Sequence, residues 1–418
     1  MRTYRAVIIG GGSAGLAAAI TLKQNGIDDI LILEKDREPG GILQQCIHNG
    51  FGLQTFKEQL SGPAYAERFI DQARELEIPI KLNTMVTHMY PDRTIEYMNS
   101  EEGCVTIGAD AIILAVGCYE RNRGAVEIPG ERPAGVFTAG QAQRYLNIEG
   151  YMVGKKVFIL GSGDIGLIMA RRMTLEGAQV FGVAELMPYS NGLPRNIQQC
   201  LNDFNIPLYL SHTVTHIYGK DRLRQIELSQ VDENRKPIPG TQQYFNVDTL
   251  LLSVGLIPEN HLAEEAGVVL DPRTRGPIVD EDYMTNVEGI FSCGNGLHVH
   301  DLVDFVTLQA QRAGQGAADY LKNGLKQNKH ISVKPGEGIS YVVPAIVHPG
   351  EVKEKKEFFF RTKGLADKAV IRAVSDGKVI RKLNRTKLIP SEMERITLTD
   401  SQLNELTGDL VIEMEELK

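Results

Sequence analysis

The pattern of hydrophobic and polar positions repeats one local unit twice, at residues 4–34 and 156–185. Each copy begins with a short apolar run that predicts a buried strand. Each then passes through a glycine cluster of the form G-x-G-x-x-G into a helix and returns to a second apolar strand. That second strand ends in an acid, Glu34 or Glu185, 19 residues after the last glycine of the cluster. Apolar runs bounded by glycine and alternating with helical periodicity are typical of β-α-β units with a parallel sheet.

A second sequence pattern is also repeated, once after each of the two units. Residues 110–117 and 248–255 are both apolar strands that end at a glycine. The spacing of the two copies is about the size of a domain, so the repeat indicates a duplicated dinucleotide-binding fold rather than a solenoid of short units. We therefore expect an α/β protein with two Rossmann-like domains.

The last part of the chain has a different pattern. A long helix is predicted from about 304 to 321, and charged residues become more frequent after about residue 330. Regularly spaced short strands predict a small all-β domain there; they are expected at 341–347, 357–360, 369–374, 379–383, 396–398 and 410–414. The predicted division is a first domain made of 1–116 and 256–330, a second domain of 117–255, and a C-terminal β-rich domain of 331–418.

Composition narrows the functional classes. The 418 residues are 42% hydrophobic and 23% charged, with a net charge of −8, which is typical of a globular protein and not of a nucleic-acid binder. No apolar run reaches 18 residues, so no membrane span is expected. The five cysteines are irregularly spaced, which predicts neither a disulfide framework nor a zinc ribbon and favours a reducing, cytoplasmic setting.

The first glycine cluster fits a dinucleotide-binding fingerprint. Gly10 permits the tight turn, Gly12 lets the backbone approach a pyrophosphate, and Gly15 lets the helix pack against the strand. The helix N-terminus supplies free N–H groups and a positive dipole end for the phosphates. Glu34 is placed to accept hydrogen bonds from the ribose hydroxyls.

These motifs together resemble the two-domain flavoproteins of the pyridine nucleotide-disulfide oxidoreductase superfamily. The resemblance covers about residues 1–325 and implies that the first fingerprint binds FAD, the second binds NAD(P)H, and residues 289–295 hold the ribityl chain. The superfamily usually has Asp where this chain has Asn295, an uncharged residue that can still hydrogen-bond a hydroxyl. The resemblance implies cofactor contacts at Gly10, Gly12, Ser13, Ala14, Gly15, Glu34, Lys35, Gly40, Gly41, Val86, Ala115, Gly117, Gly161, Gly163, Asp164, Ile165, Gly166, Glu185, Gly255, Gly294 and Asn295.

The choice of nicotinamide depends on Glu185. A carboxylate at this place accepts bonds from a 2′-hydroxyl and repels a 2′-phosphate, so NADH is favoured over NADPH. Arg195 lies near in sequence and has two interpretations, a solvated loop residue or a phosphate ligand.

Two sets of residues are candidates for catalysis. Cys46 lies where the superfamily carries its redox cysteine, and we expect a helix N-terminus and His48 to lower its pKa. A buried core residue is the alternative, and no second cysteine stands at CxxC or CxxxxC spacing. His298 and His300 are candidates for acid–base work; the alternative is a loop in which Asp301 or Asp304 caps the long helix. A metal is not expected, because no third ligand motif accompanies the two histidines.

A closer resemblance concerns partners. Residues 118–123, 128–130 and 135–143 resemble the FAD/NAD-binding subunits of multi-subunit amine, opine and proline dehydrogenases and sarcosine oxidase. Residues 41–52 and 297–306 resemble a bacterial oxidoreductase that accompanies anaerobic glycerol-3-phosphate dehydrogenase-like flavoproteins. In such systems a partner subunit oxidises the substrate and this type of chain exchanges electrons with NAD.

Three functions are compatible with these patterns. The first is an FAD-dependent, NAD(H)-linked oxidoreductase that exchanges electrons with a partner flavoprotein or a small acceptor. The second is a non-catalytic assembly subunit that keeps nucleotides as structural ligands and docks through its β-rich tail. The third is a single-cysteine NADH oxidase or peroxidase that uses Cys46.

Overall fold

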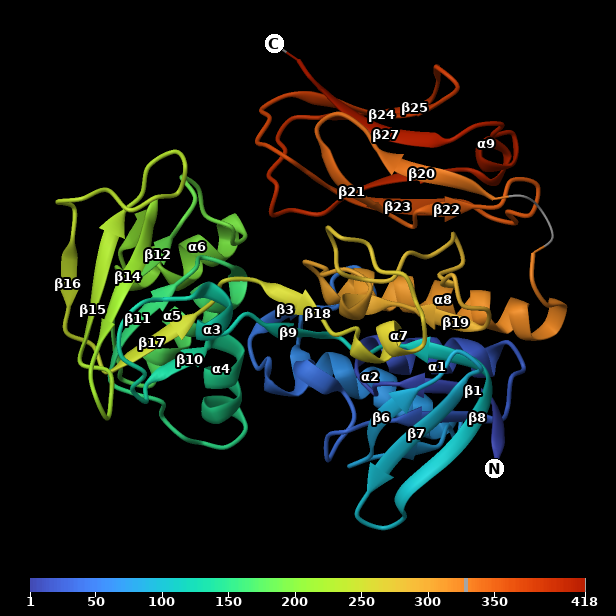
Figure 1. The fold of residues 1–418 in the computed structure, drawn as a ribbon, viewed down its shortest axis with the longest axis horizontal. Coiled ribbons are helices and arrows are strands. Elements are labelled where there is room, and N and C mark those ends of the chain that lie inside the picture. The colour runs from blue at the N-terminus through green and yellow to red at the C-terminus, as the bar shows by residue number, and fades with distance from the viewer. Residues whose placement is uncertain (327–329, 418) are drawn as a thin grey trace. The chain divides into compact units, whose positions relative to one another are not determined.

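The computed structural model describes residues 1–326 and 330–417 (Figure 1). These residues divide into two compact units. Unit 1 contains residues 1–44, 49–118 and 258–418, and unit 2 contains residues 45–48 and 119–257. Where the chain crosses between the units, β9 (Cys118–Glu120) pairs with β18 (Leu256–Pro258).

Unit 1 is built on a seven-stranded sheet with a parallel centre. Its strand order is β5-β2-β1-β8-β7-β6, and β19 pairs with β8. The register aligns Ile9 with Leu33 on one side and with Leu114 on the other, so the carboxyl ends of the central strands meet at one edge. The strands are β1 (Thr3–Ile9), β2 (Ile30–Leu33), β5 (Ile80–Lys81), β6 (Met85–Met89), β7 (Thr94–Asn99), β8 (Gly103–Leu114) and β19 (Ile290–Ser292).

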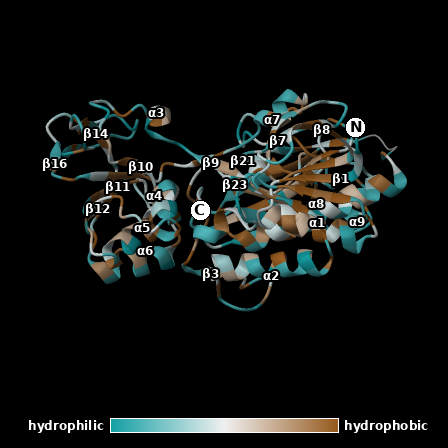
Figure 2. Cartoon of the chain, turned by 90° about the horizontal axis from the view of Figure 1, so that it is seen from below, coloured by the Kyte–Doolittle hydropathy of each residue, from teal (hydrophilic) through white to brown (hydrophobic). Residues whose placement is uncertain are grey.

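Helices α1 (Ser13–Gln24), α2 (Gly62–Glu75) and α8 (Val303–Asn323) contribute to one hydrophobic core with this sheet. Small residues allow α1 and α8 to approach closely: a Cβ on Gly314 of α8 would lie 2.6 Å from the carbonyl oxygen of Ala18. Strands β1 and β8 are strongly hydrophobic (Figure 2). A second core includes α7 (His261–Glu265). Between these elements lie η1 (Gly41–Gln45), β3 (Asn49–Phe51), β4 (Leu60–Ser61) and η3 (Gly294–Gly296).

Unit 2 repeats the pattern with a five-stranded parallel sheet. Its order is β10-β17-β11-β12-β13, and a three-stranded antiparallel sheet, β14-β15-β16, belongs to the same unit. The strands are β10 (Val136–Thr138), β11 (Lys156–Leu160), β12 (Gln179–Glu185), β13 (Leu208–Leu210), β14 (His212–Tyr218), β15 (Gln225–Gln230), β16 (Gln243–Phe245) and β17 (Thr249–Leu252). The helices are α3 (Arg123–Val126), α4 (Ala139–Asn147), α5 (Asp164–Leu175), α6 (Pro194–Cys200) and η2 (Asn202–Phe204).

The C-terminal segment forms two further sheets around its own core and clusters with unit 1. The first has the order β22-β20-β27-β24-β25, and the second β21-β23-β26. Their members are β20 (Ile331–Pro335), β21 (Ile339–Val343), β22 (Ile346–Val347), β23 (Lys356–Thr362), β24 (Ala369–Ser375), β25 (Lys378–Arg385), β26 (Glu394–Leu398) and β27 (Leu410–Glu416), together with the short helix α9 (Asp400–Asn404).

The predicted α/β fold with two Rossmann-like sheets and a C-terminal β-rich part is confirmed. The predicted long helix is α8, and each short strand expected after residue 340 has a counterpart. The compact unit that holds the second glycine cluster covers 45–48 and 119–257, whereas the sequence predicts 117–255. The three-domain division stays a prediction. None of the helices in the described part of the chain is long and apolar enough to cross a membrane.

Candidate dinucleotide sites

The first fingerprint joins β1 to α1 in unit 1, with the geometry that a phosphate cradle needs. A Cβ on Gly15 would lie 1.8 Å from the carbonyl oxygen of Gly10, so only glycine allows this helix to pack against the turn. At Gly12 the nearest atom to an added Cβ is Gly41 Cα at 3.9 Å, which leaves one face of the backbone open. No side chain caps the helix, whose first turn carries Ser13 and Ala14. These residues fit a pyrophosphate bound by backbone.

Glu34 lies beside this cradle at the end of β2 and is only 5% exposed. Its two carboxylate oxygens accept hydrogen bonds from the backbone N–H groups of Gly11 (2.6 Å) and Asp36 (2.8 Å). This fixes the carboxylate next to the fingerprint, as a ribose ligand requires. Lys35, the next residue, is exposed.

The Gly40–Gly41 turn packs against the same backbone. The N–H of Gly40 donates to the carbonyl oxygen of Gly11 (2.8 Å), and a Cβ on Gly41 would lie 3.1 Å from Gly12 Cα. The structure therefore brings this turn, predicted as part of the flavin site, into contact with the fingerprint.

The late glycine motif, which follows β19 and forms η3, reaches the same region. Gly294 has a φ of +68°, and a Cβ there would meet the side chain of Ala14 at 2.9 Å. Asn295 Oδ1 accepts a hydrogen bond from the N–H of His300 (3.0 Å), and its contact with a ribityl chain stays a prediction. Of the other predicted contacts, Ala115 and Gly117 follow β8 and Val86 is buried in β6.

Neither aspartate caps α8, so that alternative is wrong. The N-cap residue is Leu302, and it makes no side-chain cap bond. Asp301 forms an ion pair with Arg361 of β23. The carboxylate of Asp304 does not bond the N–H groups of its own helix. It accepts three backbone N–H bonds from the loop after β3 instead.

The three donors to Asp304 are Thr55 (2.7 Å), Gln54 (3.1 Å) and Gly52 (3.2 Å). Asp304 is 2% exposed. A carboxylate that accepts this many backbone bonds fixes the loop against the start of α8. Its role was not visible in the sequence, since the partners lie about 250 positions away.

His298 and His300 are both buried and are bridged by Gln309 of α8. Gln309 Oε1 accepts from Gly294 N–H (2.8 Å) and from His300 Nε2 (3.1 Å), while its amide donates to His298 Nε2 (2.8 Å). Burial lowers the pKa of His300 to about 4 and holds the pKa of His298 well below its ordinary value. Both rings are therefore neutral near pH 7, and their acid–base role stays a prediction.

The second fingerprint, in unit 2, joins β11 to α5 in the same way. A Cβ on Gly166 would lie 2.7 Å from the carbonyl oxygen of Gly161, and no side chain caps the helix at Gly163. Glu185, 4% exposed, accepts from Ser162 N–H (3.0 Å) and Met187 N–H (2.9 Å), matching Glu34.

Of the remaining predicted residues of this site, two begin α5 and the third follows β17. Asp164 accepts from the N–H of Leu193 (2.8 Å) and from Asn196 (2.6 Å). Ile165 is the next residue of the helix, and Gly255 follows β17 with a φ of +106°.

Cys46 does not have the environment expected from the sequence. It follows the short 3-10 helix η1 instead of beginning a helix, and its sulfur lies 3.8 Å from Gln143 Oε1 in unit 2. Burial raises the pKa of the thiol to about 12, so the prediction of a lowered pKa is wrong. His48 cannot assist as a cation either, because burial and the charges of Arg195 and Arg171 lower its pKa to about 4.

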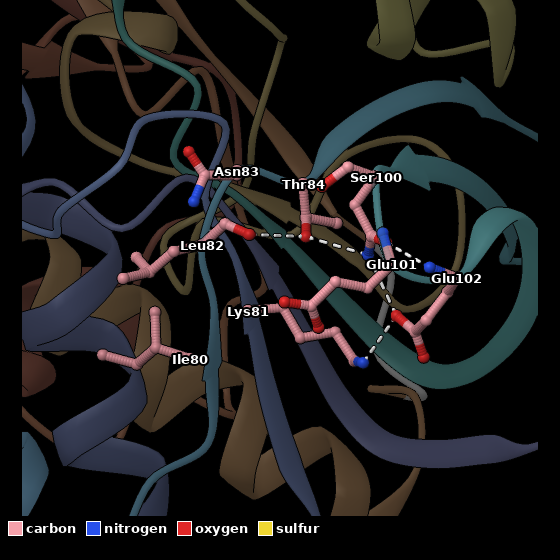
Figure 3. A pocket seen from close by; sticks show the side chains of 9 residues that line it. Ile80, Lys81, Leu82, Asn83, Thr84, Ser100, Glu101 and Glu102 are labelled. Carbon is pink, nitrogen blue, oxygen red and sulfur yellow. Dashed lines mark hydrogen bonds and ion pairs between the residues drawn. The ribbon is translucent and has the colours of Figure 1, made fainter.

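A polar pocket of about 300 Å³ lies near the end of β2 (Figure 3). Its wall is tied to Glu34, since Thr84 N–H donates to the carbonyl oxygen of Glu34 (2.9 Å). Lys81 Nζ lies 2.7 Å from Glu102 Oε2, and Asn99 donates to the same carboxylate (2.9 Å). None of the predicted cofactor residues lines this pocket.

Three side chains of types that can bind a metal ion lie close together elsewhere in unit 1. Ligand atoms of Asp280, Glu281 and His348 lie within 4.8 Å of one another. The ammonium group of Lys326, however, contacts Glu281 and also lies 2.6 Å from Asp282. A cation is thus already supplied by the chain, and the hydrogen bond between His348 and Glu281 joins the C-terminal segment to the preceding part of unit 1.

Comparison with known proteins agrees with this geometry. A family model described as pyridine nucleotide-disulphide oxidoreductase matches residues 4–317. The HcnB subunit of hydrogen cyanide synthase from Pseudomonas protegens is 27% identical over 284 residues, which are 63% of this chain and 58% of that protein. An opine oxidase subunit from Agrobacterium tumefaciens is 24% identical over 312 residues, 70% of this chain and 61% of that protein. The chain thus spans about three-fifths of these relatives' length.

A solved structure shows the same fold. Thioredoxin reductase from T. acidophilum superposes with a TM-score of 0.62 at 23% identity, covering 76% of this chain and 99% of that chain. The family match ends at residue 317, before the C-terminal strands begin.

Proposed function

The chain belongs to the pyridine nucleotide-disulphide oxidoreductase family, and from this premise we propose that it transfers a hydride between NADH and bound FAD. The family binds FAD and NAD(P)H. The observation that carries the proposal is that one arrangement, here called a cradle, occurs twice. Each cradle consists of a fingerprint (10–15 or 161–166), whose helix starts without a side-chain cap, and a buried glutamate (Glu34 or Glu185) held by backbone N–H groups. The flavin, when bound, supplies the two-electron chemistry; the protein binds and orients both nucleotides.

The residues divide the work between the two units. In unit 1 the backbone of 10–15, the carboxylate of Glu34 and the amide of Asn295 would hold FAD. In unit 2 the backbone of 161–166 and Glu185 would hold NADH. No ion pair joins Arg195 to Glu185 in the described part of unit 2, and the guanidinium charge instead acts on His48. This supports NADH over NADPH, because a 2′-phosphate would meet an anionic carboxylate.

The destination of the electrons is proposed from the relatives. Both the cyanide synthase and the opine oxidase relatives are named as subunits. No disulfide joins the five cysteines in the described structure, and burial raises the pKa of Cys46, Cys200 and Cys293. A thiolate relay is therefore disfavoured. We infer that reduced flavin delivers electrons to a partner flavoprotein or to a small acceptor.

The test is anaerobic addition of NADH to the purified yellow protein. The proposal predicts FAD as the released flavin and loss of its visible absorbance on adding NADH. The non-catalytic alternative predicts bound nucleotide with no bleaching. Co-purification of a second flavoprotein that reoxidises the flavin would identify the acceptor.

A further inference from the structure

The two fingerprints, 10–15 and 161–166, keep their glycines at the first, third and sixth positions but differ at the second, fourth and fifth, and the second position bears on the glutamate. Gly11 in the first fingerprint corresponds to Ser162 in the second. At Gly11 an added Cβ would lie 3.1 Å from both Cβ and Oε2 of Glu34, so the carboxylate lies directly against the backbone. In unit 2 the serine side chain is accommodated and fully buried.

Ser162 Oγ lies 2.7 Å from Glu185 Oε2. A carboxylate only accepts hydrogen bonds, so the hydroxyl proton of Ser162 must point to Glu185. Together with the N–H groups of Ser162 and Met187, this gives the buried carboxylate three donors, whereas Glu34 has two. Glu185 is therefore held more firmly than its counterpart.

The same hydroxyl also holds the loop that follows β12. Its oxygen accepts from Asn191 N–H (3.0 Å) and lies 3.1 Å from the hydroxyl of Ser190. A Cβ on Gly192 would lie 2.8 Å from the carbonyl oxygen of Ser162, so the loop packs directly on the fingerprint. Ser162 thus connects the glutamate, the fingerprint backbone and residues 190–192.

We propose that Ser162 is a positioning residue that sets the preference for a nucleotide without a 2′-phosphate, by locking Glu185 and the 190–192 loop in one arrangement. The inference deepens the proposed function and rests on NADH binding at the second cradle. A carboxylate fixed by three donors cannot turn aside for a 2′-phosphate. It presents its remaining acceptor capacity to ribose hydroxyls at little cost in ordering.

The experiment measures binding without redox chemistry. The dissociation constants of ADP-ribose and 2′-phospho-ADP-ribose are measured by calorimetry on the holoprotein, for the wild type, Ser162→Ala, Glu185→Gln and Ser229→Ala. Ser229 is a matched control, since it is a buried serine of the same unit whose hydroxyl bonds Thr215 (3.0 Å).

We expect Ser162→Ala to weaken ADP-ribose binding about tenfold, the usual effect of losing a hydrogen bond to a charged group. Binding of the 2′-phosphorylated ligand should change less, so discrimination falls; Ser229→Ala should leave the ratio unchanged. An unchanged ratio in Ser162→Ala, while Glu185→Gln loses discrimination, overturns the role of Ser162 alone. Absence of ADP-ribose binding to the wild type, or unchanged discrimination in Glu185→Gln, overturns the proposed NADH site itself.

Discussion

The side-chain amide of Gln309 donates a 2.8 Å hydrogen bond to Nε2 of His298, and its carbonyl oxygen faces His300 Nε2 at 3.1 Å. Because the oxygen accepts and the NH₂ donates, His300 carries its proton on Nε2 and His298 on Nδ1. Both Nδ1 atoms are buried and have no hydrogen-bond partner in the described structure. A second proton on either ring would place an unpaired charge in the core of unit 1.

This arrangement predicts that stability falls in acid. The folded pKa of His300 is about 4, below its ordinary 6.5, so between these values the unfolded chain binds a proton that the folded chain does not. Lowering the pH through this window therefore favours unfolding, by about 1.4 kcal/mol per pH unit for each such histidine.

Urea unfolding across this window checks the prediction. His300→Gln should reduce the pH slope by about one proton relative to the wild type. His88 serves as the opposite control: its hydrogen bond to Glu265 raises its pKa, so its stabilisation is present in acid and is lost as the pH rises. Parallel pH profiles for the wild type and His300→Gln would contradict this account.

Asp304 is predicted to fix the loop after β3. Asp304→Ala leaves the backbone N–H groups of residues 52, 54 and 55 without their acceptor, at a cost of about 2–4 kcal/mol. Limited proteolysis should cut this loop faster, and urea unfolding should report the loss. Asp28→Asn is the control, since its carboxylate is 82% exposed and its ion pair with Lys23 is worth little. Equal proteolysis rates in the two variants would refute the anchoring role.

Arg361 is predicted to hold the C-terminal segment on the rest of unit 1. Its guanidinium pairs with Asp301, whose other oxygen accepts from Met393 N–H (2.6 Å). Arg361→Ala strands a half-buried carboxylate and should cost about 3 kcal/mol. Arg372→Ala breaks more exposed pairs with Glu413 and Glu415 and should cost less than about 1 kcal/mol. Comparable losses in chemical denaturation would show that the Arg361 pair has no special role.

Gly15→Ala is predicted to abolish FAD binding, because the new Cβ would lie 1.8 Å from the Gly10 carbonyl oxygen. Gly364→Ala is the matched control, since nothing lies within 4 Å of an added Cβ there. The flavin content of the purified variants is the measurement. Full FAD occupancy in Gly15→Ala would place the cofactor elsewhere.

Cysteine alkylation tests the thiol environments. Cys104 is exposed, whereas Cys46 and Cys293 have their pKa raised to about 12 by burial. Iodoacetamide at mildly alkaline pH should label Cys104 first, followed by mass spectrometry of the peptides. Rapid labelling of Cys46 in the native protein would support a reactive thiolate and revive the single-cysteine alternative.

The parts of the fold that depend on neighbours in sequence could be predicted. The strands before Gly10 and Gly161 and the acids Glu34 and Glu185 follow from local apolar runs and fixed spacing, and the structure has them as expected. The β-rich tail also follows from its short alternating runs.

The contacts that join distant segments could not be predicted. Asp304 at the start of a helix is an ordinary capping pattern, and only the folded chain shows that it binds residues 52–55 instead. Cys46 next to His48 looks like an activated thiol, but burial by segments far away in sequence reverses the direction of its pKa shift. No sequence pattern predicted that Gln309 bridges His298 and His300, since these contacts depend on how α8 packs.

The central claim is that a nicotinamide bound at the second cradle reduces a flavin bound at the first. The most direct test mixes NADH anaerobically with the wild type and with Gly166→Ala, in which a Cβ would lie 2.7 Å from the Gly161 carbonyl oxygen. The wild type should lose its flavin absorbance; the variant should keep FAD, fail to bleach with NADH, and still bleach with dithionite. A wild type that retains its colour, or a variant that bleaches with NADH as fast, would contradict the account.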